Sequence, residues 1–285
     1  MLVSCQTESN PDPAIPEMCQ EWAFYAEPCN GAASLCQRAY DQVAYATTHN
    51  SMANAADEWL WPNQNLTMKE QLAAGVRAFM IDTHYDETNA DLIPSLCHGH
   101  CALGQISLSD ALEQFSAFLA CNPQQILTLI IEAYVSAEDT RNAFEEAGLT
   151  QWAYTHESGR PWPTLNTLIE RDQRLIVLSD EGEQTDWYMP VWDHAFETHF
   201  SVEQIDDFSC EPNRGSTDNA LFILNHFLSA PLPSADLALQ ANLAPLFSTR
   251  AESCQTRFNR IPNFVTVDFF DLGDTKMVVD QLNGL

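Results

Sequence analysis

The chain has 285 residues, of which 12 are Lys or Arg and 40 are Asp or Glu, so its formal net charge is −28 at pH 7. Such a field repels nucleic acid and anionic membrane surfaces, which excludes nucleic-acid binding and docking through a basic patch. No stretch approaches 18 consecutive apolar residues, so we expect no helix that spans a membrane.

The first half of the chain alternates apolar runs with helical patterns. We expect a flexible tail over residues 1–16, a short amphipathic helix over 17–25 and a first buried strand over 43–47. A capping box formed by Thr67 and Glu70 opens the helix that follows. The alternation continues with strands at 76–83, 96–98 and 126–131, and with helices at 107–120 and 138–147.

The second half repeats this alternation less regularly. We expect a helix over 162–170, strands over 174–179, 221–225 and 264–270, and a weaker strand near 196–200. Eight strands with intervening helices predict an α/β protein with a (β/α)8 TIM-barrel fold, irregular around its fifth and sixth strands. Because no break in composition marks a boundary, we assign residues 17–285 to one domain.

Polar or ionisable side chains follow nearly every predicted strand. Functional groups of such barrels collect at the carboxyl ends of the strands, so we expect these side chains to form one site. Two histidines that titrate near neutral pH can act as general base and general acid across a phosphorus centre. Amide and carboxylate oxygens are the ligands that a hard cation such as calcium prefers. The set comprises His49, Asn50, Asp82, His98, Glu132, Ser179, Asp180, Asn225, His226 and Asp268.

Each of these residues also has a structural interpretation. A single His49 or His98 is more often a hydrogen-bonded structural histidine than a catalyst, and Glu132 could pair with Arg77. The shared position at the strand ends favours the functional interpretation for the set as a whole. We assign the remaining histidines to structural or surface roles: His84, His100, His156, His194, His199 and His226.

Nine cysteines suggest an oxidising compartment. Zinc is the alternative, but the chain contains no CxxC pair. Cys121 lies on the apolar face of a predicted helix and is expected to be a buried free thiol, while Cys19 has no evident partner. Residues 2–5 (LVSC) resemble the cleavage box of a bacterial lipoprotein, which predicts lipid anchoring through Cys5 and a tether formed by the polar residues after it.

Short pieces of sequence spread from residue 26 to 285 resemble the X domain of phosphatidylinositol-specific phospholipase C, especially its small secreted single-domain members. Any single piece is a weak signal, whereas their order and spacing are specific. The pieces include residues 48–51 (THNS), 96–99 (LCHG), 131–135 (IEAYV), 210–214 (CEPNR) and 263–270 (NFVTVDFF).

The resemblance implies a distorted TIM barrel with His49 as general base and His98 as general acid. It places Asn50, Asp82 and Glu132 at the calcium site of the metal-dependent members. Met80 stands where those members carry a second carboxylate on the same strand, which should weaken calcium binding. Together with local spacing, the resemblance favours three disulfides, Cys29–Cys36, Cys97–Cys101 and Cys210–Cys254.

We therefore expect an extracytoplasmic phosphoric diester hydrolase of the phospholipase C type, cleaving a phosphatidylinositol-like lipid through a cyclic phosphate. Ser179, Asn225 and Asp268 are the candidates for substrate binding. One alternative is a phosphodiesterase acting on soluble glycerophosphodiesters or sphingolipids, and another is a noncatalytic headgroup-binding module. The expected partner is a phospholipid or small phosphodiester, and we expect a monomer.

Peripheral membrane contact is also expected. Tryptophans can anchor a protein at a lipid surface, although they more often pack in the core. The candidates for a membrane-facing rim are Trp59, Trp61 and Trp187.

Overall fold

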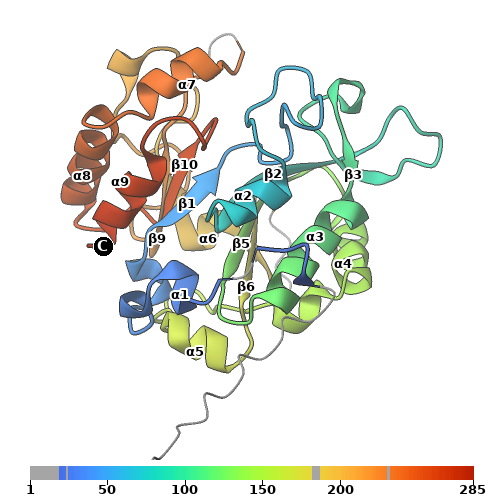
Figure 1. The fold of residues 1–285 in the computed structure, drawn as a ribbon, viewed down its shortest axis with the longest axis horizontal. Helices are drawn as coiled ribbons and strands as arrows, with labels where there is room; N and C mark the ends of the chain where they lie inside the picture. The colour runs from blue at the N-terminus through green and yellow to red at the C-terminus, as the bar shows by residue number, and fades with distance from the viewer. Residues whose placement is uncertain (1–18, 24, 182–186, 230–231) are drawn as a thin grey trace, which may run out of the picture.

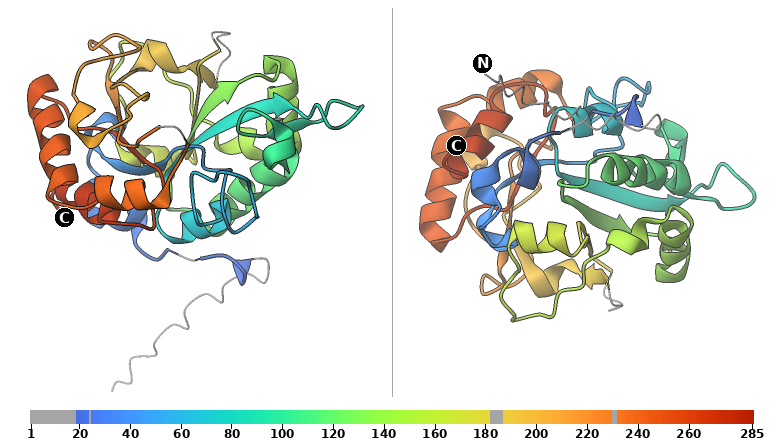
Figure 2. Two further views of the ribbon diagram at one scale, coloured as in Figure 1. Left: turned by 90° about the horizontal axis from the view of Figure 1, so that it is seen from above. Right: turned by 60° about the horizontal axis from the view of Figure 1, so that its bottom comes forward.

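The computed structural model describes residues 19–23, 25–181, 187–229 and 232–285. In these ranges eight parallel strands curve around a common axis with helices on the outside (Figures 1 and 2). Their order is β7-β6-β5-β2-β1-β10-β9-β8, so within the described residues the barrel is open between β7 and β8. In chain order they are β1 (Tyr45–Thr48), β2 (Ala78–Tyr85), β5 (Leu127–Ala133), β6 (Leu175–Ser179), β7 (Tyr188–Pro190), β8 (Ala195–Glu197), β9 (Leu221–Asn225) and β10 (Phe264–Val267).

The predicted helices that connect the strands are present. Thr67 forms the predicted capping box with Glu70 at the start of α2. No helix in the described ranges is long and apolar enough to cross a membrane. The α-helices are α1 (Pro28–Gly31), α2 (Met68–Ala73), α3 (Leu108–Cys121), α4 (Ala137–Glu146), α5 (Leu165–Glu170), α6 (Val191–His194), α7 (Ala235–Ala241), α8 (Leu246–Phe258) and α9 (Thr275–Leu282).

The predicted helix over residues 17–25 is wrong for the residues that the structure describes. Residues 19–22 form turns, and the Tyr25 amide donates a hydrogen bond to Asn122 Oδ1 at the end of α3. Contacts with another part of the fold, rather than a helical ladder, satisfy this backbone. The predicted tail over 1–16, with its anchor at Cys5, lies outside the described residues and stays a prediction.

The prediction of a parallel barrel strand over 96–98 is also wrong, because the strand found here is antiparallel. The short strand β3 (Pro94–Leu96) runs antiparallel to the end of β2 and pairs on its other side with β4 (Ile106–Ser107). The end of β2 extends past its parallel partner β5. Its backbone hydrogen bonds are therefore made with the antiparallel strand β3 instead. The eighth parallel strand is instead β7, which the sequence analysis did not predict.

The disulfides include the three that were expected, Cys29–Cys36, Cys97–Cys101 and Cys210–Cys254. A fourth joins Cys19 to Cys121 across 102 positions of the sequence. The expectation of a free thiol at Cys121 is therefore wrong. Local spacing could not reveal this pair, because the turn at Cys19 meets the end of α3 only after folding.

Arg77 is buried at the back of the barrel. Its guanidinium donates to the carbonyls of Leu72 and Val76 and to Gln125 Oε1. It also lies over the ring of Tyr25, 4.3 Å from the centroid. Arg77 thus stabilises the end of the barrel opposite the predicted site, without pairing with Glu132.

A buried polar cluster centres on His226, the residue that directly follows β9. Its contacts are those of a structural histidine. The His226 ring stacks on Phe247, donates from Nε2 to the Ala241 carbonyl and accepts a hydrogen bond at Nδ1 from Arg250. Burial, and then the adjacent Arg250 charge, lower the pKa of His226 to about 3. His226 is therefore neutral in the folded protein over the usual working range of pH.

Acidification from pH 7 to 5 is expected to weaken the fold through His226. The unfolded imidazole, with a pKa near 6.5, takes up a proton over this range, whereas the folded one does not. This difference lowers the free energy of unfolding by up to about 2 kcal/mol. Urea unfolding at both pH values should show a smaller decrease in the free energy of unfolding for His226→Gln than for the wild type. The exposed His100→Gln is the matched control, and parallel losses in wild type and His226→Gln would contradict the prediction.

Candidate functional site

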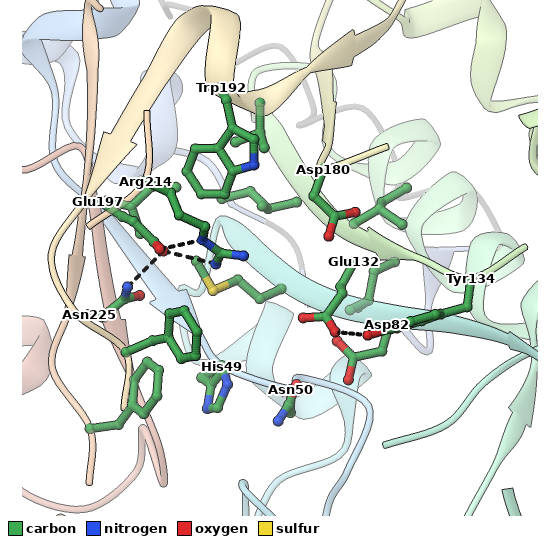
Figure 3. A pocket seen from close by; sticks show the side chains of 18 residues that line it. His49, Asn50, Asp82, Glu132, Tyr134, Asp180, Trp192, Glu197, Arg214 and Asn225 are labelled. Carbon is green, nitrogen blue, oxygen red and sulfur yellow. Dashed lines mark hydrogen bonds and ion pairs between the residues drawn. The ribbon is translucent and has the colours of Figure 1, made fainter. Parts of the chain in front are cut away.

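A pocket of about 320 Å³ opens at the carboxyl ends of the barrel strands. Figure 3 shows Asp82, Glu132 and Tyr134 along one side and Glu197, Arg214 and Asn225 along the opposite side, with His49 and Asn50 below. The structure therefore brings together most of the residues that the sequence placed at the strand ends.

His49 follows β1 directly, and its backbone amide continues the ladder to Val267 of β10. Its Nδ1 lies 2.9 Å from Asp268 Oδ1, and Phe227 stacks on its ring with centroids 3.8 Å apart. Because Nδ1–H donates to the carboxylate, Nε2 carries the lone pair and can accept a proton. The contact with Asp268 thus sets both the tautomer and the orientation of the His49 ring.

Asp268, predicted as a substrate-binding candidate, lies beside His49 rather than in the pocket lining. It is buried, pairs with His49 and accepts a second hydrogen bond from Asn63, and it does not line the pocket. We interpret it as a positioning residue for His49 rather than a group that binds substrate.

Asp268→Asn is expected to lower kcat by at least about 10²-fold, because an amide can hold His49 in the wrong tautomer while filling the same space. Steady-state cleavage of a soluble phosphodiester measures the effect, with circular dichroism as the check on the fold. Asp271→Asn is the matched control, since this exposed carboxylate three residues on accepts hydrogen bonds from Asn65. Equal activity of the two variants would show that Asp268 does not position the base.

His98 reaches the site from the loop after β3, not from the end of a parallel strand. The disulfide Cys97–Cys101 closes this loop, and the Cys97 amide donates to the Asp82 carbonyl. Burial, and then the nearby His49, lower the pKa of His98 from its ordinary value. His98 thus lies on a short covalently closed loop next to Asn50, which lines the pocket, although His98 is not itself a lining residue.

Asn50 links His98 to the acidic side of the pocket. Its φ of 43° lies in the left-handed region, which asparagine tolerates better than most residues. With its side-chain oxygen facing His98, that oxygen accepts from Nε2 at 3.2 Å, and the amide nitrogen lies 3.3 Å from both Asp82 carboxylate oxygens.

Three carboxylates gather on the acidic side. Asp82 and Glu132 are paired neighbours on β2 and β5, and Asp180 follows β6. Burial, with repulsion from the Glu132 and Asp180 carboxylates, raises the pKa of Asp82 well above its usual range. Burial also raises the pKa of Asp180, and the Tyr134 hydroxyl donates to Glu132 Oε1.

A hard cation would relieve this crowding of negative charge. Among the described residues, no group of three or more His, Cys, Asp or Glu side chains is placed so that it could hold a metal ion. The donors present are the oxygens of Asp82 and Glu132 and the reorientable amide of Asn50, and Met80 lines the same pocket without adding a charge. A calcium ion here would take few side-chain oxygens and would need water for its remaining ligands, so calcium binding stays a prediction.

The other predicted residues divide between the pocket and its support. Ser179 is fully buried, donates to the Tyr188 hydroxyl and does not line the pocket, whereas its neighbour Asp180 does. Asn225 lines the pocket, but its amide donates to Glu197. Of these two residues only Asn225 is placed to reach a bound ligand, and the substrate-binding roles of both stay predictions.

Several lining residues were not predicted as part of the site. Glu197 ends β8, three residues before the end of the weak strand predicted near 196–200, and Arg214 belongs to the CEPNR piece, which carried no assigned role. Trp192, Phe200 and Phe227 add aromatic surface. The strand-end rule would have found Glu197 only if the predicted strand had ended there, and no local signal places Arg214 in this pocket.

Comparisons with known proteins agree with this architecture. A family model described as PI-PLC X 1 matches residues 35–283. The PI-PLC X domain-containing protein 1 of Arthroderma benhamiae is 28% identical over 278 residues, which is 90% of each chain. An uncharacterized secreted protein of the same organism is 26% identical over 288 residues, covering 90% of this chain and 63% of the relative.

Among solved structures, the phosphatidylinositol-specific phospholipase C from Listeria monocytogenes superposes with a TM-score of 0.55. The match covers 88% of this chain and 95% of that chain at 14% sequence identity. At this identity the likeness shows the fold, an α/β barrel of this type, and the chemistry must be argued from the residues.

Proposed function

Because the chain belongs to the PI-PLC X domain family, we propose that it is a phosphodiesterase of the phospholipase C type that cleaves phosphatidylinositol-like phosphodiesters. The observation that carries the proposal is the His49–Asp268 pair, which presents a general base to a pocket that His98 and three carboxylates also approach. A pair of histidines held in this way suits proton transfer at both ends of an in-line displacement.

In this mechanism His49 Nε2 takes the proton from the headgroup hydroxyl beside the phosphate, and Asp268 stabilises the imidazolium that forms. The hydroxyl oxygen attacks phosphorus, and His98 protonates the departing alcohol. When bound by Asn50, Asp82 and Glu132, calcium would lower the pKa of the attacking hydroxyl and neutralise charge on the phosphate. The first product is a cyclic phosphate, and diacylglycerol leaves.

Phosphorus NMR of phosphatidylinositol incubated with the protein tests this proposal, once with calcium and once with a chelator. The expected result is a cyclic inositol phosphate signal that disappears with chelation. No product in either condition would contradict the assignment to phosphatidylinositol, and a cyclic product in both would contradict the metal requirement.

Two alternatives make different predictions. A phosphodiesterase for soluble glycerophosphodiesters or sphingolipids would cleave those substrates in preference, and the charge of −28 is compatible with a zwitterionic lipid. A noncatalytic module would bind headgroups without turnover. The retention of His49, Asp268 and His98 in one site favours an enzyme.

Secretion and peripheral lipid contact belong to the same proposal. The four disulfides among the described residues fit an oxidising compartment. Of the three candidate tryptophans, Trp59 is buried and Trp187 packs on Phe144, so Trp61 is the one that is exposed. It lies on the loop after β1, on the same side as His49, where it could touch a zwitterionic lipid surface.

A further inference from the structure

The segment of residues 209–219, here called the arm, leads from β8 to β9 and is attached to α8 along most of its length. The attachments come from one stripe of α8 and the turn after it, at positions three or four residues apart. They are a hydrogen bond from Arg250 to the Ser209 carbonyl, the disulfide Cys210–Cys254, a bidentate ion pair of Arg257 with Glu211, and hydrogen bonds from Arg260 to the carbonyls of Thr217 and Asn219.

The arm also pairs with the end of β8 and so brings Arg214 to the pocket. The Glu197 amide donates to the Arg214 carbonyl, and the Asn213 amide donates to the Glu197 carbonyl. Gly215 follows with a φ of 77°, and an added Cβ there would lie 2.2 Å from the Ala195 carbonyl oxygen. Only glycine allows the chain to pass so close to β8 immediately after Arg214.

Glu197 is fully occupied by groups of the protein. Its Oε1 accepts hydrogen bonds from Asn213 and from Arg214 Nε, and its Oε2 accepts from Arg214 Nη2 and from Asn225. The side chain of Glu197 is only 3% exposed. Its function is therefore to hold Arg214, with little capacity left for a ligand.

Arg214, in contrast, has one edge of its guanidinium group that is free to donate hydrogen bonds to a ligand. Its guanidinium lies over Trp192 at 4.5 Å and over Phe200 at 4.7 Å from the ring centroids, and its side chain is 42% exposed. In the described part of the chain Nη1 has no hydrogen-bond acceptor, and Figure 3 shows the guanidinium directed toward the middle of the pocket. Of the described residues that line the pocket, Arg214 is the one Lys or Arg.

We propose that Arg214 is a specificity-determining residue, whose free edge donates hydrogen bonds to the oxygen atoms of a polyhydroxylated headgroup. This inference rests on the proposed phosphodiesterase function and adds the feature that selects the headgroup. A planar guanidinium held by a carboxylate and two aromatic rings is pre-organised to bind two oxygens at once. A headgroup that ends in a quaternary ammonium would meet a like charge at the same place.

Isothermal titration calorimetry on the full chain can test this in a His49→Ala background, which prevents turnover. The ligands are glycerophosphoinositol and glycerophosphocholine, which share the phosphodiester and differ in the headgroup. We expect Arg214→Gln to lower the affinity for glycerophosphoinositol at least about tenfold. The affinity for glycerophosphocholine should stay the same or increase. With the wild-type His49, the same substitution should raise KM for phosphatidylinositol more than it lowers kcat.

Two further variants separate recognition from structure. Arg214→Lys keeps the charge beside Glu197 but loses the planar fork, so an intermediate affinity is expected and the fold is less at risk. In the double variant Glu197→Gln/Arg214→Gln no buried carboxylate is left unpaired, yet binding should stay weak. Arg160→Gln, an exposed change outside the pocket, is the control.

The outcomes distinguish this inference from the proposed function. Equal losses of affinity for both ligands would indicate that Arg214 contacts the phosphate, and this would overturn the inference. Wild-type affinity in the double variant would overturn it as well. Turnover with binding that does not depend on Arg214 would overturn the inference alone. Binding that depends on Arg214 without turnover would support the inference and overturn the enzymatic proposal, and no binding of either ligand would overturn both.

Discussion

His49→Ala is expected to lower kcat for phosphodiester cleavage by about 10²–10⁴-fold, the usual contribution of a positioned general base. The ring of His49 is held by Asp268 and Phe227, so its removal takes away the one group at the end of β1 that can accept the substrate proton. Initial rates with phosphatidylinositol measure the loss. His100→Ala is the control, because that side chain is 82% exposed.

Substrates with different leaving groups distinguish the proposed roles of the two histidines. With a nitrophenyl phosphodiester, whose leaving group needs no proton, His98→Ala should lose much less activity than it does with the lipid. His49→Ala should lose about as much with either substrate, since attack still needs a base. Identical behaviour of both variants on both substrates would contradict the assignment of base and acid.

Asp82→Asn is expected to remove the response of the protein to calcium. In the wild type, calcium should raise the thermal unfolding midpoint, because a ligand that binds only the folded state stabilises it by mass action. In the variant the shift should be largely lost, together with calcium-dependent activity, since one of two anionic ligands is gone.

The same substitution should have the opposite effect on the metal-free protein. Burial and the neighbouring Glu132 and Asp180 carboxylates raise the pKa of Asp82, so its charge is costly without a cation, and an amide of the same shape avoids that cost. We therefore expect Asp82→Asn to unfold at a higher temperature than the wild type in chelator. Asp91→Asn, on an exposed loop, is the control, and equal calcium shifts in wild type and Asp82→Asn would remove Asp82 from the metal site.

Much of the barrel could be predicted because its signals are local. The run at 221–225 is β9 to the residue, and the strands near His49, Asp82 and Glu132 were predicted within two or three positions. An uninterrupted apolar run reflects burial on both faces wherever the strand lies in the sheet. The short β7 lacked such a signal, and the predicted 264–270 strand ends at Val267, before Phe269 adopts a φ of 47°.

Strand periodicity and the parallel arrangement were enough to place His49, Asn50, Asp82 and Glu132 at one edge of the barrel. The packing of the folded chain decided that Asp268 contacts His49, that an antiparallel hairpin presents His98, and that Cys19 pairs with Cys121. It also decided that the arm held by α8 brings Arg214 into the pocket. The physical reason is that these contacts join residues far apart in the chain, and their geometry depends on how loops pack, which no local pattern encodes.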